Sequence, residues 1–340
     1  MTRGAAPARR ALGTTGMAVS GVGFGAWAVG GGEGRFRRDD ADEADAVAAI
    51  RRAVELGVNW IDTSPAYGYG RSERIVAAAL AGIPAPDRPY VFTKCGVLWD
   101  EARPEEPPRL AARAQSIRRE LDGSRRRLGV ERIDLLQVHW PPEDGTPLEE
   151  YWGAMVGLRD EGRIGAAGLS NHDVAQLEAA EAVGHVDCLQ PPFSLIARRA
   201  AADVIPWCRQ HGTGVIVYSP MQSGLLSGSF SEARARSLPD SDWRKWSPDF
   251  QGADLRRNLS LADALAPVAA RHGVTRAAVA VAWTLSWPGV SGAIVGARAP
   301  KQVDEWASAA TLELGVDDLD EIAAAIERTG AGDGPTRPDE

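Results

Sequence analysis

Residues 134–170 read DLLQVHWPPEDGTPLEEYWGAMVGLRDEGRIGAAGLS. The stretch opens with a short apolar run, 134–139, which is typical of a buried strand. An amphipathic segment follows and predicts a helix over 147–161, and a second short run predicts a strand over 166–170. A strand, a helix and a strand in this order form a βαβ unit, whose two strands lie parallel in one sheet.

The same alternation continues in both directions along the chain. Before the first unit, 11–12 and 18–19 are expected to pair as a small hairpin. The predicted strands are 22–25, 59–63, 90–94, 134–139, 166–170, 187–190, 214–218 and 292–295. The predicted helices are 42–56, 72–80, 110–128, 147–161, 174–183, 201–210, 261–271, 276–287, 301–310 and 317–328. Two long loops are expected, at 97–108 and 219–257.

Eight strand–helix units without a break in composition predict an α/β protein with a closed (β/α)8 barrel, the TIM barrel. The barrel domain is expected to span 11–328, with an N-terminal tail over 1–10 and a disordered C-terminal tail over 329–340. A doubly wound sheet is the alternative. It is disfavoured because the glycine-rich segment 21–25 lies within the first strand and lacks the GxGxxG spacing.

Composition narrows the function classes. The chain has 340 residues and a formal net charge of −8, and the acidic balance argues against a nucleic-acid partner. No apolar run approaches the roughly 20 residues of a membrane span, so a soluble protein without a membrane partner is expected. Cys95, Cys188 and Cys208 have no CxxC spacing, which predicts reduced thiols, no metal site and a cytoplasmic location. Oligomeric state cannot be derived from these patterns.

Polar side chains follow the predicted strands at their carboxyl ends, where barrels of this kind carry their chemistry. These residues are Asp62, Tyr67, Lys94, His139, Ser170, Asn171, Gln190, Tyr218 and Arg298. Each alone has an ordinary structural interpretation, such as a helix cap or a hydrogen-bonded buried histidine. Together they are expected to surround one mouth of the barrel.

Lys94 is one of only three lysines, and it ends the apolar run 90–93. A buried ammonium is costly unless it is paired, and Asp62 is the expected partner. The charge of Lys94 would then lower the pKa of Tyr67, which could exchange a proton with a substrate oxygen that His139 orients. Because this proton transfer needs no nucleophile and no metal, another group must supply the bond change, and a hydride from a nicotinamide suits the arrangement.

Several segments, in order, resemble the aldo-keto reductase family: 59–68 (NWIDTSPAYG), 92–94 (FTK), 136–141 (LQVHWP), 168–171 (GLSN), 217–220 (VYSP) and 294–298 (IVGAR). The resemblance covers about 11–328. It implies a (β/α)8 barrel that binds NADP(H) and reduces an aldehyde or ketone, including sugars and keto-sugars, to an alcohol. The implied catalytic residues are Asp62, Tyr67, Lys94 and His139, with Tyr67 as general acid.

The resemblance also implies a cofactor site. Ser170, Asn171 and Gln190 would hold the carboxamide, and Tyr218 would stack on the nicotinamide. The residues implied along the rest of the cofactor are Ser219, Met221, Gly224 and Leu225 at the pyrophosphate, Gly296, Arg298 and Gln302 toward the 2′-phosphate, and Glu305 at the adenine. Trp306 stands where the family commonly has Asn.

The aromatic residues Trp27, Trp99 and Trp140 are candidate walls of the substrate pocket, with core or rim positions as the alternative. Three other functions stay open at this point. One is a lyase that uses Lys94 as a Schiff base. Another is a redox-neutral epimerase or isomerase that acts through a transient ketone with bound NADP. The third is a non-catalytic NADP-binding regulatory subunit.

Overall fold

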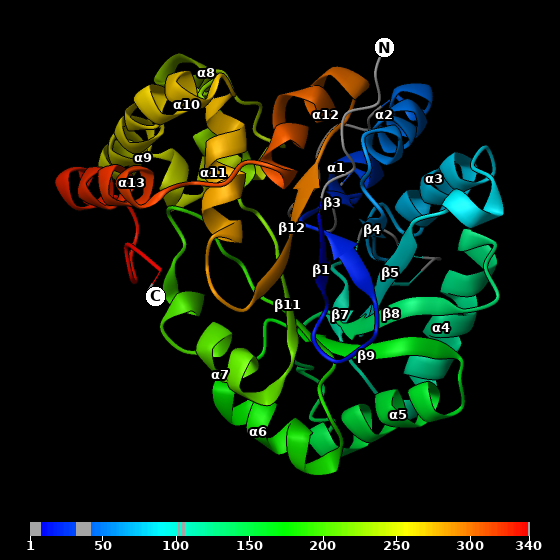
Figure 1. Ribbon diagram of the computed structural model, residues 1–340. Helices are drawn as coiled ribbons and strands as arrows, with labels where there is room; N and C mark the ends of the chain where they lie inside the picture. Colours follow the sequence, from blue (N-terminus) through cyan, green and yellow to red (C-terminus); the bar gives the residue numbers. More distant parts are fainter. Residues whose placement is uncertain (1–7, 32–41, 101–102, 104–105, 339–340) are drawn as a thin grey trace.

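The computed structural model describes residues 8–31, 42–100, 103 and 106–338. Within them, eight parallel strands close into a barrel in chain order, and the last, β12, pairs with the first, β3 (Figure 1). The barrel strands are β3 (Val22–Gly25), β4 (Trp60–Asp62), β5 (Tyr90–Cys95), β8 (Ile133–Val138), β9 (Ile164–Ser170), β10 (Cys188–Gln190), β11 (Gly214–Val217) and β12 (Val290–Gly296). The predicted (β/α)8 barrel is confirmed.

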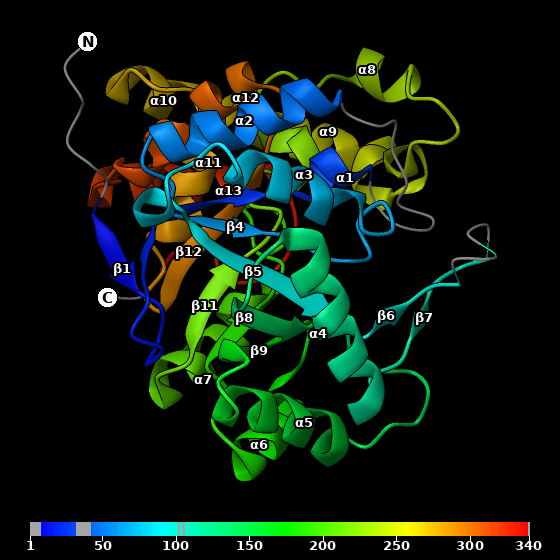
Figure 2. The same ribbon diagram turned by 90° about the vertical axis from the view of Figure 1, so that its right-hand side faces the viewer.

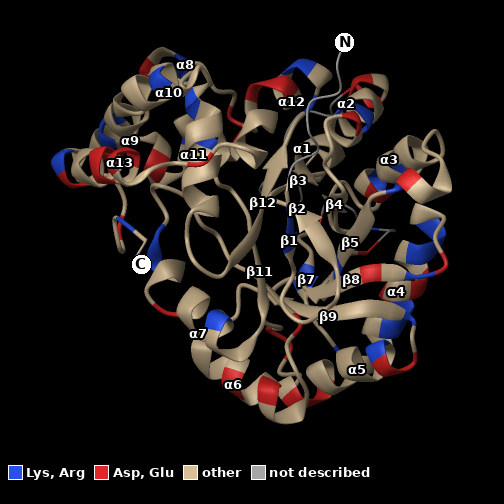
Figure 3. Ribbon diagram, in the orientation of Figure 1, with Lys and Arg blue, Asp and Glu red and all other residues tan. Residues whose placement is uncertain are grey.

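Helices surround the barrel, and most of the Lys, Arg, Asp and Glu residues coloured in Figure 3 lie on these outer elements. The helices are α1 (Trp27–Gly30), α2 (Glu43–Glu55), α3 (Arg71–Leu80), α4 (Ala114–Leu128), α5 (Leu148–Asp160), α6 (Val174–Val183), α7 (Val204–His211), α8 (Glu232–Arg236), α9 (Gly252–Ala264), α10 (Ala266–His272), α11 (Arg276–Leu285), α12 (Pro300–Trp306) and α13 (Val316–Thr329). In the parts of the chain described here, none of them combines the length and apolar character needed to cross a bilayer.

Local sequence explains where several helices begin and end. α6 starts with a capping box, in which Asp173 accepts the Gln176 backbone N–H and the Gln176 side chain accepts the Asp173 N–H, each at 2.9 Å. α4 ends at Gly129, which has a φ of 67° and so closes the helix in the left-handed conformation. These caps satisfy backbone groups that a helix end leaves without partners.

The barrel interior is filled in its lower half by apolar side chains, one inward-pointing residue from most strands. Trp60 is the largest of them, and its indole Nε1–H donates to the Ser20 carbonyl at 2.8 Å. The neighbouring strand β3 has no room for a side chain at position 23, since a Cβ at Gly23 would lie 2.2 Å from the Trp60 ring. Leu12 and Val19, from the N-terminal hairpin, complete this layer and close the bottom of the barrel.

Two short sheets lie outside the barrel. The predicted hairpin is present as β1 (Arg9–Ala11) and β2 (Ala18–Ser20), so the predicted N-terminal tail is shorter than expected. The segments β6 (Val97–Leu98) and β7 (Arg109–Leu110) pair antiparallel and project away from the barrel (Figure 2). The predicted helix over 110–128 is therefore wrong in its first turn, because Leu110 pairs with Val97.

The C-terminal half differs from expectation in two places. The predicted loop 219–257 contains α8 and the start of α9, and the helix expected over 261–271 breaks at Leu265, just before Pro267. Within the tail expected to be disordered, residues 331–338 are described, and some of them contact the loop after β10. Ala331 is buried, and the Arg198 N–H donates to the Asp333 carbonyl at 3.1 Å.

Candidate active site

A polar layer lies directly above the apolar interior of the barrel. Four side chains from different strands meet there: Asp62 from β4, Lys94 from β5, Gln137 from β8 and Gln190 from β10. All four are buried, and each hydrogen-bonds to at least one of the others. Because a buried polar group must find its partners inside the protein, these four positions depend on one another.

Lys94 and Asp62 form an ion pair, with 2.5 Å between Lys94 Nζ and Asp62 Oδ1 and no exposed surface on the Lys94 side chain. Nζ also donates to the Thr63 carbonyl at 3.0 Å. The expected pairing of these two residues is therefore present. An ammonium in this position is compensated by a carboxylate, which the cost of burying an isolated charge requires.

Two glutamines hold the other oxygen of Asp62. Gln137 Nε2 donates to Asp62 Oδ2 at 3.2 Å, and Gln190 Nε2 donates to the same atom at 2.9 Å. Gln190 Nε2 also donates to Gln137 Oε1 at 3.0 Å. The carboxylate thus faces donors only, the surroundings that an ionised, acceptor-only group can satisfy.

Tyr67 and His139 lie over this layer. Tyr67 sits in the turn between β4 and α3, with 7% of its surface exposed, and its ring meets that of His139 edge-on, with 5.6 Å between centroids. Lys94 Nζ lies 5.2 Å from the centroid of the Tyr67 ring. Burial and, secondarily, the charge of Lys94 hold the pKa of His139 well below its ordinary value, so the imidazole is neutral at pH 7.

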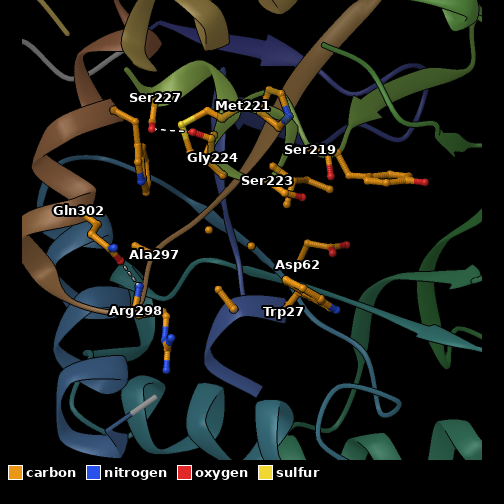
Figure 4. A pocket seen from close by; sticks show the side chains of 18 of the residues that line it. Trp27, Asp62, Ser219, Met221, Ser223, Gly224, Ser227, Ala297, Arg298 and Gln302 are labelled. Atoms are coloured by element: carbon orange, nitrogen blue, oxygen red, sulfur yellow. Dashed lines mark hydrogen bonds between the residues drawn. The ribbon is translucent and has the colours of Figure 1, made fainter. Parts of the chain in front are cut away.

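The strand ends open into a cavity of about 490 Å³, within the range of small-molecule sites. Trp27 and Asp62 lie on one side of it and Arg298 and Gln302 on the other (Figure 4). The sequence-predicted residues that line it are Trp27, Asp62, Tyr67, His139, Trp140, Ser170, Asn171, Gln190, Tyr218, Ser219, Met221, Gly224, Gly296, Arg298, Gln302 and Glu305. Lys94 lies beneath this lining, in contact with Asp62 and with its Nζ close to the Tyr67 ring.

Asn171 is fixed from both ends of its side chain. Its Nδ2 donates to the His139 carbonyl at 3.0 Å and to Ser170 Oγ at 3.1 Å, and its Oδ1 accepts the Tyr218 hydroxyl at 2.9 Å. The residue has a φ of 63°, a conformation that Asn tolerates better than most residues. Burial raises the pKa of Tyr218, so its phenol stays protonated and keeps donating to Asn171.

The turn after Tyr218 has an unusual backbone. Gln222, Ser223 and Gly224 have successive φ values of 44°, 52° and 100°. Side chains hold this turn in place, since Ser194 Oγ donates to Gln222 Oε1 at 2.9 Å and Gln222 Nε2 donates to Asp249 at 2.7 Å. Strained backbone of this kind is retained where the surrounding structure fixes it, and it is common at ligand sites.

The far side of the cavity carries the basic side chain of Arg298 and the acidic side chain of Glu305. Arg298 follows β12, its backbone N–H donates to Gln302 Oε1 at 2.7 Å, and both side chains line the cavity with Glu305. A dinucleotide fits this layout on chemical grounds. Between the amides at one side and the guanidinium at the other lie residues with little or no side chain, including Gly25, Gly224, Gly296 and Ala297.

Besides Lys94, two predicted site residues lie outside the cavity lining. Trp99 instead packs on Tyr69, with 5.5 Å between ring centroids. Leu225 is fully buried in the apolar core behind the cavity wall. Their placement depends on how the long loops fold back, which no local pattern reveals.

Sequence reasoning missed several lining or supporting residues. Those in the cavity wall include Ser223, Ser227, Phe230 and Arg234, from the long loop after β11 and from α8. Gln137 was missed for another reason. It lies in a strand two residues from Leu135, which points inward, and two from His139, so the alternation of strand side chains could have identified it.

Comparisons with known proteins agree with this geometry. A family model described as the Aldo/keto reductase family matches residues 21–327. The chain is 33% identical to the NADH-specific methylglyoxal reductase of Escherichia coli strain K12, over 93% of this chain and 98% of that protein. It is also 33% identical to the aldo-keto reductase YhdN of Bacillus subtilis strain 168, over 93% and 92% of the two chains. The structure of the glycerol dehydrogenase AKR11B4 from Gluconobacter oxydans superimposes with a TM-score of 0.84 at 31% identity, covering 98% of each chain.

Proposed function

Because the chain belongs to the aldo/keto reductase family, we propose that it reduces a small aldehyde or ketone to an alcohol with NADPH, and that Tyr67 is the general acid. The observation that carries the proposal is the buried Lys94–Asp62 pair directly beneath Tyr67 and His139. The positive charge of Lys94 below a tyrosine that lines the cavity suits proton transfer. A buried charge that served only to pack the core would have no such role.

A bound nicotinamide supplies the hydride for the carbonyl carbon. The chain supplies the proton. As the carbonyl oxygen gains negative charge, the Tyr67 hydroxyl donates its proton to that oxygen, and the ammonium of Lys94 stabilises the phenolate that remains. Asp62 keeps Lys94 in place, and its bonds to Gln137 and Gln190 keep Asp62 in place.

His139 orients the substrate oxygen as a neutral donor. Its Nδ1 lies 3.4 Å from Ser64 Oγ, and that oxygen already accepts the Ala66 N–H at 3.2 Å. The Ser64 hydroxyl can donate its hydrogen to Nδ1, and in that tautomer the ring proton is on Nε2, where it can be donated to the substrate. A neutral imidazole does not compete with Tyr67 as the acid.

The choice of NADPH rests on Arg298 at the far side of the cavity, because a guanidinium binds a phosphate monoester by charge-assisted hydrogen bonds. One relative is named as NADH-specific, so NADH is the alternative to compare.

For the substrate, the relatives' names point to small oxygenated carbonyl compounds and polyols. The three free, buried cysteines support the proposed cytoplasmic location.

The proposal is tested by following NADPH and NADH oxidation with a panel of methylglyoxal, glyceraldehyde, dihydroxyacetone, ketoses and keto-deoxysugars. The wild type should turn over at least one carbonyl compound. Tyr67→Phe should lower kcat by at least about 100-fold, the scale of general acid catalysis, with cofactor affinity nearly unchanged.

Tyr69→Phe is the matched control, since Tyr69 lies two residues away and outside the cavity lining. It should retain full activity. An unchanged kcat in Tyr67→Phe would show that Tyr67 is not the acid, and the absence of turnover with every carbonyl compound and both cofactors would refute the proposed reaction.

A further inference from the structure

We propose that Gln137 is a positioning residue that fixes the amide of Gln190, so that only the Gln190 oxygen faces the cavity. The base of the cavity then presents a hydrogen-bond acceptor, which selects a ligand group bearing N–H, such as a carboxamide. This inference rests on the proposed function, because the carboxamide in question is that of the nicotinamide.

The orientation of both amides follows from Asp62. A carboxylate paired with an ammonium is acceptor-only, so each glutamine must turn its Nε2 toward Asp62 Oδ2. Gln137 Oε1 then faces the second N–H of Gln190, at 3.0 Å between Oε1 and Nε2. Both hydrogens of Gln190 Nε2 are thereby used within the buried layer.

Gln190 is the member of this pair that reaches the ligand. It lines the cavity, whereas Gln137 is fully buried and lies outside the lining. With both its N–H groups directed to Asp62 and Gln137, the polar atom that Gln190 can offer to the cavity is Oε1. A carboxamide NH2 can donate to that oxygen, but an acetyl group cannot, because it has a carbonyl oxygen and no N–H.

The neighbouring strand is shaped to admit Gln137. A Cβ on Gly168 of β9 would lie 3.0 Å from Gln137 Cγ and 2.9 Å from the Cys188 carbonyl oxygen. Glycine at 168 thus leaves space for a long side chain at 137 to pass over β9 toward β10. Gln137 has a built position between Asp62 and Gln190, and its amide is not a chance occupant of the core.

The experiment compares the binding of NADP⁺ with that of its 3-acetylpyridine analogue, in which acetyl replaces the carboxamide. Kd values are measured by quenching of tryptophan fluorescence in wild type, Gln137→Leu, Gln190→Leu and the double variant. Gln137→Met, whose side chain is close in length, is a second variant if Gln137→Leu does not fold. If the wild type prefers NAD⁺, the comparison is made between NAD⁺ and its 3-acetylpyridine analogue.

The wild type should favour the carboxamide by roughly 10-fold, the value of one buried hydrogen bond. Gln137→Leu should reduce this preference to about 3-fold or less, because the Gln190 amide loses one of its two anchors. In the Gln190→Leu background, Gln137→Leu should cause no further loss of preference, since Gln137 acts through Gln190.

Leu135→Val is the control on the same strand, because Leu135 points into the barrel one pleat below Gln137 and contacts neither amide through hydrogen bonds. It should lower the melting temperature and leave the preference unchanged. Two results would overturn this inference and leave the proposed function standing. One is that Gln137→Leu prefers the carboxamide as strongly as the wild type does. The other is that Gln137→Leu reduces the preference equally in the wild-type and Gln190→Leu backgrounds. Failure of the wild type to bind either dinucleotide would overturn the proposed function and this inference with it.

Discussion

The chain has only three lysines and otherwise uses arginine for positive charge. Of the three, Lys94 is the buried one. Its pairing with Asp62 does not argue for stability, because desolvation of both charges offsets most of their attraction. The pair argues for a function, since an apolar pair of similar size would fill the same space at lower cost. At the scale of single residues, this is the clearest sign of where the chemistry takes place.

Arg298 provides a prediction at the same scale. Arg298→Ala should weaken NADPH binding by about 10- to 100-fold, because it removes charge-assisted hydrogen bonds to the 2′-phosphate. NADH affinity should change little, since NADH lacks that phosphate. Kd values for both cofactors, measured by fluorescence titration, check the prediction.

Arg234 is the matched control, because it lines the same cavity from α8 and packs over Phe230. Arg234→Ala should affect NADPH and NADH alike. Equal losses of NADPH and NADH affinity in Arg298→Ala would show that Arg298 does not recognise the 2′-phosphate and would leave NADH as the better candidate for the cofactor.

At the scale of elements, α4 packs a carboxyl group against β5. Glu120 Oε2 accepts the Gly96 N–H at 2.9 Å, while Oε1 is buried and has no hydrogen-bond partner in the described part of the chain. Burial raises the pKa of Glu120 from 4.5 to about 8, against a smaller lowering effect of that hydrogen bond and of Arg127. The folded protein therefore holds a proton here that the unfolded chain releases.

Between pH about 4.5 and about 8 the folded state binds the extra proton, so the free energy of unfolding falls as pH rises through this window. One such proton contributes a slope of at most about 1.4 kcal/mol per pH unit. Glu120→Gln is neutral at every pH and should remove that part of the slope. Relative to wild type, the variant should gain stability from pH 5 to pH 8, measured by urea unfolding at several pH values.

Glu131→Gln serves as the control for this prediction, because Glu131 is an exposed glutamate shortly after the same helix. Its pH dependence should match that of the wild type. If Glu120→Gln and wild type show parallel curves from pH 5 to pH 8, Glu120 is ionised in the folded protein.

At the scale of the whole molecule, the chain end closes over the loop that follows β10. The Arg198 side chain has 3% of its surface exposed, and it donates to the carbonyls of Ala331 and Gly334 at 3.1 and 3.3 Å. Truncation after Gly330 would remove these two acceptors from the Arg198 guanidinium. We expect a loss of about 1–3 kcal/mol in the free energy of unfolding and a lower melting temperature.

Arg199→Ala tests whether the loss comes from the buried contacts. It removes only the ion pair between Arg199 and Asp333, whose side chains are 85% and 52% exposed, and should change stability by less than about 1 kcal/mol. An unchanged melting temperature in the truncated protein would mean that residues 331–338 contribute nothing to the fold.

The barrel and the positions of its strand ends were predictable because they follow from local pattern. Short apolar runs alternate with amphipathic segments, and a residue at the end of a parallel strand must lie at the same mouth as its counterparts on the other strands. On this ground the sequence alone predicts that Asp62, Lys94 and His139 lie together. The resemblance of several short motifs then indicated the family, which the comparisons show.

What the pattern could not decide is set by contacts between residues far apart in the chain. Three features depend on how the connections fold back over the barrel: the positions of Trp99 and Leu225, the contacts of 331–338, and the residues that the long loop after β11 brings to the cavity. The buried amides show the reason most clearly. Gln137 and Gln190 are 53 positions apart, and each amide is oriented only by what surrounds it. The sequence shows only that a glutamine side chain has both a donor and an acceptor. Which of these atoms faces the ligand depends on the partners that the closed barrel brings within hydrogen-bond distance.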